Sequence, residues 1–216
     1  AETPQQKKAG IPDTIDQFYA DTMKGGHNLN DPALVRTLTT HAKDAVAWLV
    51  SLGADLNTVG RAGGAKYPRA HRPTDGSAIG PEVIRVLWKA AKDRKMDVRT
   101  QTRATEIIMK DGRVAGVKAT TKDGKVYTID AKAVVLATGG FGANQDMLVK
   151  YQPKLKGYAT TNQPGATGDG IILAEHAGAA LVDMKQIQAH PTAAPDGTLI
   201  SESVRGDGGI LINAEG

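Results

Sequence analysis

The sequence predicts an α/β protein that also contains α+β elements, and three features predict this fold class. Apolar residues recur at helical spacing through much of the N-terminal half. Asp-Gly turns then separate β-prone runs over about residues 104–130, which predicts a three-stranded antiparallel meander. Further on, the apolar run "AVVLA" at 133–137 is typical of a strand buried on both faces of a sheet.

Several segments have the apolar spacing or the boundary residues of helices. They are 12–26, 31–53, 80–96, 144–151 and 169–177. The second is the best marked, with Asp31 as N-cap and Pro32 in the first turn. Short strands are expected near 98–100, 181–184 and 210–213 as well as in the meander. The stretch 57–80 lacks periodicity, and such long loops are often functional.

The composition limits the class of protein. A chain of 216 residues that is 40% apolar can form one or two globular domains. Its formal charge of +4 is spread along the sequence and only 4% of residues are aromatic, which argues against nucleic-acid binding. The absence of cysteine excludes disulfides, thiolate metal sites and thiol catalysis. No apolar run is long enough to span a membrane, so we expect a soluble protein, periplasmic or cytoplasmic.

Polar side chains gather in "AHPTAAPDGTLISESVRGDGG", residues 189–209, although this stretch has little regular structure. His190, Thr192, Ser201, Glu202 and Arg205 lie within sixteen residues. A lone histidine is more often structural, and a glutamate and an arginine three residues apart often form only a local ion pair. Taken together, however, the hydroxyl, imidazole and charged groups are typical of a site for carboxylates.

Two glycine-rich stretches are candidates for ligand binding. "ATGGFG" at 137–142 follows the predicted buried strand, where glycines allow a ligand to approach the backbone, although a simple turn explains them equally well. In "NQPGATGDG" at 162–170, Asp169 is expected to be the N-cap of the next helix or to accept a hydrogen bond from a ligand. The five histidines lack metal-ligand spacing, so no metal site is expected.

The sequence resembles one protein family in a series of stretches that follow the family order. These are "DTMKGGHNLNDPALV", "LGADL", "RAHRPTDG", "VVLATGGFGANQDML", "LKGYATTNQPGATGDG", "VDMKQIQAHPT" and "ISESVRGDGGILINAEG". The family is the flavoprotein subunit of fumarate reductase and succinate dehydrogenase. The sequence is most similar to its soluble flavocytochrome c type fumarate reductases and to relatives such as urocanate reductase.

The resemblance implies part of an FAD-binding domain of the glutathione-reductase type, in which the antiparallel β-meander is an insertion. The family's N-terminal βαβ unit, with the Gly-x-Gly-x-x-Gly fingerprint that grips the FAD pyrophosphate, is lacking in this sequence. The sequence also ends before the family's capping domain. We therefore expect residues 1–216 to be the central part of the domain, as an internal fragment of a longer protein.

The resemblance also implies roles for particular residues. The expected contacts with FAD come from Ala104, Thr138, Gly139, Gly140 and Asp169. His190 resembles the histidine that holds a substrate carboxylate, with Thr192 and Ser201 as hydroxyl donors beside it. Glu202 and Arg205 resemble the pair that delivers a proton, and they are the candidate catalytic residues. The family's proton donor to the substrate is a later arginine that this sequence does not contain.

The function implied by the resemblance is FAD-dependent reduction of the C=C bond of fumarate or a related α,β-unsaturated carboxylate. The expected partners are this small acid and an electron-donor domain or protein. Two alternatives remain open: a reductase of a different 2-enoate such as urocanate, or an inactive folded fragment without FAD. The first is raised by "VGRAGG", where Arg61 and Ala62 replace methionines that are common in the soluble reductases.

Overall fold

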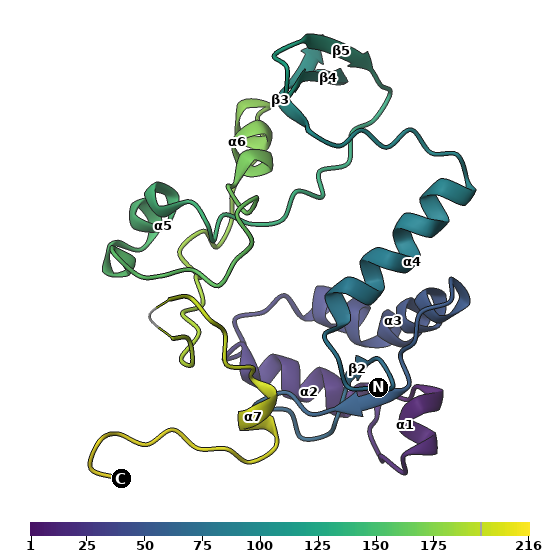
Figure 1. The fold of residues 1–216 in the computed structure, drawn as a ribbon, viewed down its shortest axis with the longest axis vertical. Helices are drawn as coiled ribbons and strands as arrows, with labels where there is room; N and C mark the ends of the chain where they lie inside the picture. The colour runs from purple at the N-terminus through teal and green to yellow at the C-terminus, as the bar shows by residue number, and fades with distance from the viewer. Residues whose placement is uncertain (195) are drawn as a thin grey trace. The chain divides into compact units, whose positions relative to one another are not determined.

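The computed structural model describes residues 1–194 and 196–216, which form two compact units (Figure 1). Unit 1 comprises Ala1–Val98 and Ser201–Gly216, and unit 2 comprises Arg99–Ile200. Helices occur in both units together with small antiparallel sheets. This mixture confirms the predicted fold class.

Unit 1 is mostly helical. Its helices are α1 (Pro4–Lys8), α2 (Ile15–Gly25), α3 (Pro32–Ser51), α4 (Ile79–Asp93) and α7 (Ser203–Gly206). The predicted helices at 12–26, 31–53 and 80–96 are confirmed, whereas the short α1 and α7 were not predicted. Helix α2 packs against α3. The core of the unit consists of Ala54, Leu56 and Val86, and apolar side chains from the end of α3 pack against it.

Asp31 caps α3 as predicted. Its Oδ1 accepts hydrogen bonds from the backbone N–H groups of Ala33 at 2.8 Å and Leu34 at 3.2 Å. Asp31→Ala is therefore expected to lower the free energy of unfolding by about 1 kcal/mol. Urea unfolding followed by circular dichroism measures this loss. Asp31→Asn retains an acceptor and should lose much less, so equal losses in the two variants would contradict the capping role.

Part of the stretch 57–80 is regular. Strand β1 (Thr58–Gly60) pairs with the antiparallel strand β2 (Ala70–Arg72), with Gly60 opposite Ala70. The prediction of a loop without regular structure is therefore wrong in part, because strands of three residues are too short to produce a recognisable alternation. Residues 61–69 form a loop that this pairing closes at its base.

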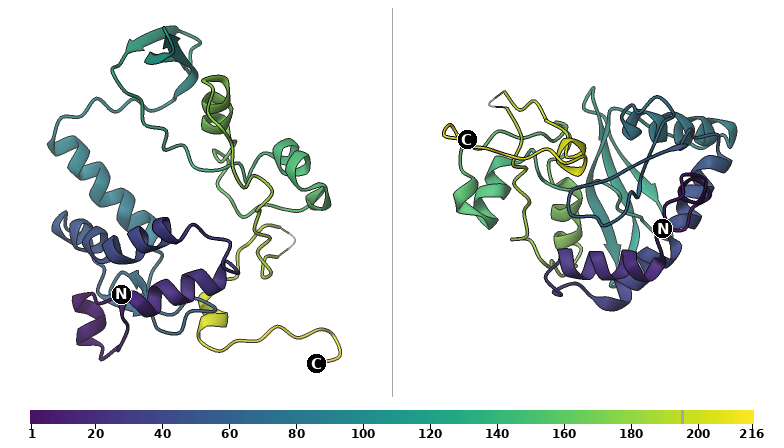
Figure 2. Two further views of the ribbon diagram at one scale, coloured as in Figure 1. Left: turned by 180° about the vertical axis from the view of Figure 1, so that it is seen from behind. Right: turned by 90° about the horizontal axis from the view of Figure 1, so that it is seen from below.

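Unit 2 is built around the predicted meander, which is confirmed. Its strands are β3 (Thr102–Lys110), β4 (Arg113–Thr121) and β5 (Val126–Asp130), in that order in the sheet. The helices α5 (Gln145–Tyr151) and α6 (Asp169–His176) confirm the predictions at 144–151 and 169–177, and the 3-10 helix η1 (Pro153–Leu155) follows α5. Helix α6 packs against β3 (Figures 1 and 2).

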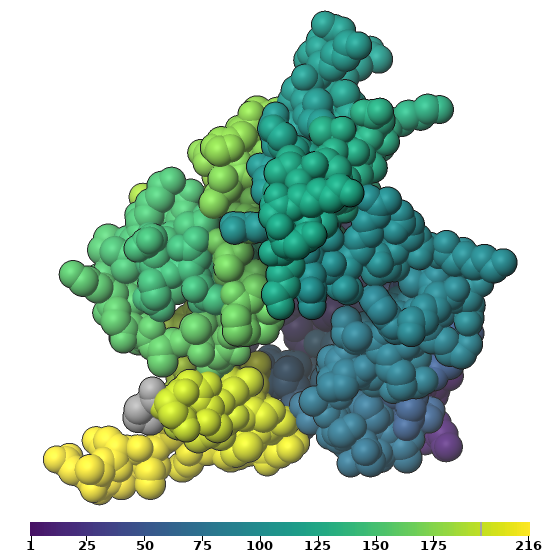
Figure 3. All heavy atoms as spheres, turned by 45° about the horizontal axis from the view of Figure 1, so that its top comes forward, coloured from purple at the N-terminus to yellow at the C-terminus, as the bar shows by residue number. Residues whose placement is uncertain are grey.

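The strands predicted at 98–100, 133–137, 181–184 and 210–213 are wrong. These residues have no strand conformation, and the sheets of the described residues contain only β1–β2 and β3–β5. A strand needs a hydrogen-bonded neighbour, and none of these segments has one. Several of their apolar residues are exposed instead: Val135 by 88% and Ile210 by 83%. Figure 3 shows the segment after α7 as a narrow yellow projection.

In residues 1–194 and 196–216, no helix combines the length and the apolar composition that crossing a bilayer requires.

Candidate functional site

A hollow of about 680 Å³ lies in unit 2 between the meander and the start of α6. Ala104, Thr138 and Asp169 all line it, although they come from three distant segments. Other lining residues include Arg103, Thr105, Thr120, Gly165, Thr167 and Leu173. Gly139 and Gly140 follow Thr138 directly but do not line the hollow themselves. The structure therefore brings together three of the residues for which the sequence predicts contact with a cofactor.

A β-bulge directs one end of β3 towards this hollow. The β3–β4 register pairs Ala104 with Ala119 and resumes at Glu106, so Thr105 has no residue opposite it. Side chains of a regular strand alternate between the two faces of the sheet. Here the consecutive residues Arg103, Ala104 and Thr105 all line the hollow. The bulge thus lies within the part of β3 that lines the hollow.

The start of α6 depends on glycine. Gly168 has a left-handed backbone with φ of 79°, and its N–H donates to the Gly140 carbonyl at 3.1 Å. Gly168 is the N-cap of α6, so the prediction of Asp169 as N-cap is wrong: Asp169 is the first helical residue. A Cβ at Gly170 would collide with the Thr138 hydroxyl. The absence of a side chain there allows Thr138 to pack against the helix start.

Asp169 is held in place by an arginine that the sequence analysis did not select. Arg103 donates from Nε to Oδ2 at 2.7 Å and from Nη2 to Oδ1 at 3.0 Å, and the Thr167 hydroxyl donates to Oδ1 at 2.8 Å. The hydrogen bonds from Arg103 are the main cause that lowers the pKa of Asp169 below its usual value, against the opposing effect of burial. Asp169 is therefore a carboxylate, an acceptor only, at the edge of the hollow.

These residues fit a cofactor that carries hydroxyl and phosphate groups. The Asp169 carboxylate can accept hydrogen bonds from sugar hydroxyls, and Arg103 adds a positive charge to the same lining. At Gly139 and Gly140 no heavy atom lies within 4 Å of the position that a Cβ would occupy, so the backbone there is open to close approach. The site can hold FAD by these contacts.

His190 lines a second hollow of unit 2, of about 640 Å³, together with Leu148, Tyr158, Thr160 and Asn162 among others. Its ring is half-buried. The Thr192 backbone N–H donates to His190 Nδ1 at 3.3 Å, and the Thr192 hydroxyl lies 3.3 Å from the same atom. Because Nδ1 accepts a hydrogen bond, the neutral ring carries its proton on Nε2. This leaves His190 a donor for an anionic group.

Ser201, Glu202 and Arg205 belong to unit 1, at or near α7. The Ser201 hydroxyl lies 2.6 Å from that of Ser203 and accepts from the Ser203 N–H at 3.3 Å, so it helps to begin the helix. Glu202 precedes the helix and Arg205 lies within it. The five candidate residues of the stretch 189–209 are thus divided between the two units: His190 and Thr192 lie together in unit 2, and the other three lie together in unit 1.

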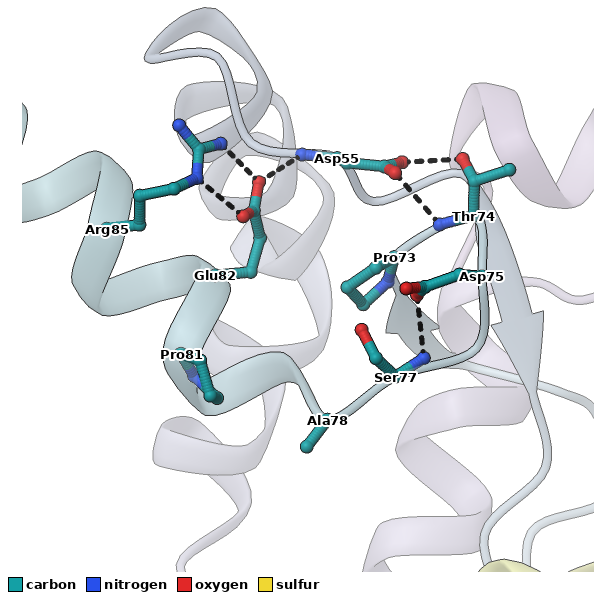
Figure 4. Close-up of a pocket in the computed structure, with 9 residues that line it drawn as sticks. All are labelled: Asp55, Pro73, Thr74, Asp75, Ser77, Ala78, Pro81, Glu82 and Arg85. Atoms are coloured by element: carbon teal, nitrogen blue, oxygen red, sulfur yellow. Dashed lines mark hydrogen bonds and ion pairs between the residues drawn. The ribbon is translucent and has the colours of Figure 1, made fainter.

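A further hollow in unit 1, of about 750 Å³, contains carboxylates that serve the fold (Figure 4). Asp55 accepts from the Thr74 N–H at 2.9 Å and from its hydroxyl at 2.8 Å. Glu82 accepts from Arg85 and from the Asp55 N–H, and the bonds from Arg85 are the main cause that lowers its pKa to about 2. No metal-binding group of three or more His, Asp or Glu side chains occurs in the part of the chain that the structure describes.

The functional candidate that the sequence did not indicate is Arg103, and the contact of the loop 61–69 with α7 was not predicted either. Arg103 stands directly before Ala104, but its partner Asp169 lies 66 residues further along the chain. No local pattern reveals such a pairing. The loop 61–69 contacts α7 through its glycine-rich tip, and the closeness of Gly63 to Glu202 is visible only in the structure.

The fold and the first hollow define a domain built to bind a nucleotide-type cofactor. The chain belongs to the FAD binding domain family, whose model matches residues 1–216.

Known proteins similar to this chain include reductases of unsaturated acids. The fumarate reductase (cytochrome) of Shewanella frigidimarina is 49% identical over 216 residues, which are 99% of this chain and 38% of that protein. The urocanate reductase of Eggerthella lenta is 38% identical over 193 residues, 87% of this chain and 32% of that protein. The open conformation of a flavocytochrome c3 fumarate reductase has a TM-score of 0.89 at 44% identity, covering 95% of this chain and 37% of that one.

These similarities confirm the resemblance of the sequence to the flavoprotein family of fumarate reductase and succinate dehydrogenase. The chain spans about a third of the length of these relatives.

Proposed function

We propose that the chain forms the central part of the FAD-binding domain of an FAD-dependent reductase that acts on the C=C bond of fumarate or a related α,β-unsaturated carboxylate. The observation that carries this proposal is the hollow in unit 2, where Ala104, Thr138 and Asp169 meet from three segments. The 49% identity with a fumarate reductase supports the substrate class.

The cofactor contacts follow from the chemistry of the hollow. The open glycines after Thr138 offer backbone hydrogen-bonding groups without steric obstruction, and Ala104 lines the same hollow as Thr138. The Asp169 carboxylate, kept ionised by Arg103, accepts hydrogen bonds from cofactor hydroxyls. When bound, FAD supplies the hydride that is transferred from its N5 atom.

His190 and Thr192 are proposed to bind the substrate. As a hydride reaches one alkene carbon, negative charge builds on the carboxylate that activates the double bond. The His190 Nε2–H, whose position is fixed by the bond that Nδ1 receives, donates to this carboxylate. Such a donor stabilises the transition state more than the ground state.

Glu202 and Arg205 are proposed to deliver the proton for the other alkene carbon. The two residues are one helical turn apart at α7, a spacing that allows a proton to pass between their side chains and water. The electrons reach the flavin from a donor domain or protein.

The whole protein provides the test of this function. Purified with FAD and given a reduced dye as electron donor, it should reoxidise the dye when fumarate is added. Absence of turnover with fumarate, urocanate and acrylate alike, in a preparation that contains stoichiometric FAD, would refute the proposal. The 216-residue chain by itself is expected to lack bound FAD and activity, which its flavin absorbance measures.

Urocanate is the second candidate substrate, favoured by the 38% identity with a urocanate reductase. Arg61, an exposed cation, lines a hollow of about 430 Å³ beside the end of α7. A cation here favours a further negative charge on the acid, as in the dianion fumarate, so the identity and not Arg61 is what favours urocanate. The ratio of kcat/KM values for the two acids distinguishes these substrates.

Arg103→Gln is expected to weaken FAD binding by at most about fivefold, because the Arg103 side chain is 68% exposed and solvent-exposed ion pairs contribute only about 0.2–1 kcal/mol. Flavin fluorescence on titration of the apoprotein measures the dissociation constant. Lys118→Gln is a matched control, because Lys118 forms a similarly exposed pair with Glu106 outside the hollow. Equal effects in both variants would contradict a role of Arg103 in the site.

A further inference from the structure

The loop 61–69 of unit 1 is anchored at one end by a buried ionic cluster, here called the Arg69 clamp: Asp13, Asp21 and Arg69. The Asp13 side chain is completely buried and accepts from Arg69 Nε at 2.8 Å and Nη2 at 2.7 Å. Arg69 Nη1 donates to Asp21 Oδ2 at 2.7 Å. One guanidinium thus joins the last residue of the loop to two carboxylates, one before α2 and one within it.

Further contacts make the clamp rigid. Gln6 Nε2 donates both to Asp13 at 3.0 Å and to the Pro68 carbonyl at 2.8 Å. The Lys66 N–H donates to Asp21 at 3.3 Å. Burial raises the pKa of Asp13, but the hydrogen bonds from Arg69 and Gln6 outweigh it, and the net pKa lies below the usual value. The carboxylate is therefore charged and fully bonded, as a buried ionic group must be.

The other end of the loop supports α7. A Cβ added at Gly63 would lie 2.9 Å from Glu202 Oε1, and a Cβ added at Gly206 would collide with the carbonyl oxygen of Arg61. Both contacts are within unit 1. Gly63 thus lies against the carboxyl group of Glu202, and Arg61 lies against the last residue of the helix that carries Arg205.

We propose that the Arg69 clamp positions Glu202 through the loop 61–69, so that Asp13, Asp21 and Arg69 are positioning residues for proton delivery. The inference rests on the proposed function, because it needs Glu202 to act in turnover. The clamp fixes the loop on α2, and the loop tip fixes the side chain of Glu202.

Gly63→Ala in the whole, FAD-loaded protein tests the tip of the loop. The contacted atom is the end of a flexible side chain, so the protein can fold while Glu202 must move. We expect kcat to fall by about tenfold, since small displacements of catalytic groups cost up to about a hundredfold. KM for the unsaturated acid should change by less than about twofold, because the substrate is bound by other groups. Gly25→Ala is the control, since no atom lies within 4 Å of its added Cβ.

Asp21→Asn tests the base of the loop. It is expected to lower kcat in the same direction as Gly63→Ala, by about threefold or more, because the loop loses one of its two charged anchors. Asp16→Asn is its control: Asp16 lies on the same helix, but its side chain is 87% exposed and pairs with Arg36 of α3 at 2.7 Å. Melting temperature and flavin content verify that each variant is folded and loaded.

The double variant Gly63→Ala/Glu202→Gln separates positioning from general stability. If the loop acts through Glu202, adding Gly63→Ala to Glu202→Gln should lower kcat by less than about twofold further. Full additivity of Gly63→Ala and Glu202→Gln would overturn the clamp inference but not the proposed function. The same conclusion follows if Gly63→Ala and Asp21→Asn each behave like their controls. If Glu202→Gln itself leaves kcat unchanged, the proposed function fails first, and the inference fails with it.

Discussion

Glu202→Gln is expected to lower kcat of the whole protein by at least about a hundredfold, the usual contribution of a positioned proton-transfer group. Glutamine has nearly the same shape as glutamate and keeps the contact with Gly63, but it cannot release and regain a proton. KM should change little, because Glu202 is proposed to carry a proton rather than to hold the acid. Steady-state kinetics with saturating electron donor measure both constants.

Glu215→Gln is the matched control for this prediction. Glu215 lies in the same unit, on the exposed segment after α7, and its replacement removes the same charge. A fall in kcat for both variants would indicate a general effect of charge. A normal kcat for Glu202→Gln would remove Glu202 from the proton path and with it the proposed role of its neighbour Arg205.

The elements that the sequence predicts correctly are those whose signals are local. Asp31 marks the start of α3 because its side chain bonds to N–H groups only two and three residues away. The meander is recognisable because the turns at Asp111-Gly112 and Asp123-Gly124 connect strands that are neighbours both in sequence and in the sheet. In each case the interaction partner lies within a few residues, where a pattern can reveal it.

The elements that the sequence predicts wrongly are strands, which form only beside a hydrogen-bonded neighbour from another part of the chain. The run at 133–137 has the composition of a buried strand, yet it becomes one only beside a hydrogen-bonded neighbour, and Val135 is instead 88% exposed. Apolar composition thus identifies a surface suited to burial without identifying what covers it. The opposite holds for β1 and β2. These strands are paired in the structure, but each has only three residues, which are too few to produce a recognisable alternation in the sequence.

The candidate site also has features that local motifs predict and features that they do not. Motifs placed Ala104, Thr138 and Asp169 among the cofactor contacts, and the three line one hollow. The sequence could not predict that Arg103 holds Asp169, that β3 has a bulge after Ala104, or that Gly63 touches Glu202. These features depend on residues that are far apart in sequence, and each one fixes the orientation of a residue that a motif identifies.

His190→Ala is expected to lower kcat/KM for the unsaturated acid by about a hundredfold or more, because removing one donor that stabilises a developing negative charge typically costs about 2.7–4 kcal/mol. The loss should appear in both kcat and KM, since the imidazole binds the carboxylate in the ground state and more strongly in the transition state. His176→Ala is the control, because His176 is an exposed histidine of the same unit, at the end of α6.

Thr192→Val provides a test that His190→Ala cannot provide. The variant keeps the imidazole and the backbone N–H that donates to Nδ1, but it removes the hydroxyl 3.3 Å from that atom and the hydroxyl's bond to the Ile200 carbonyl at 2.9 Å. If the backbone bond alone fixes the proton on Nε2, kcat/KM should fall by less than about tenfold. A loss as large as that of His190→Ala would instead make the Thr192 hydroxyl the group that binds the acid, and unchanged kinetics in both variants would exclude this pair from the substrate site.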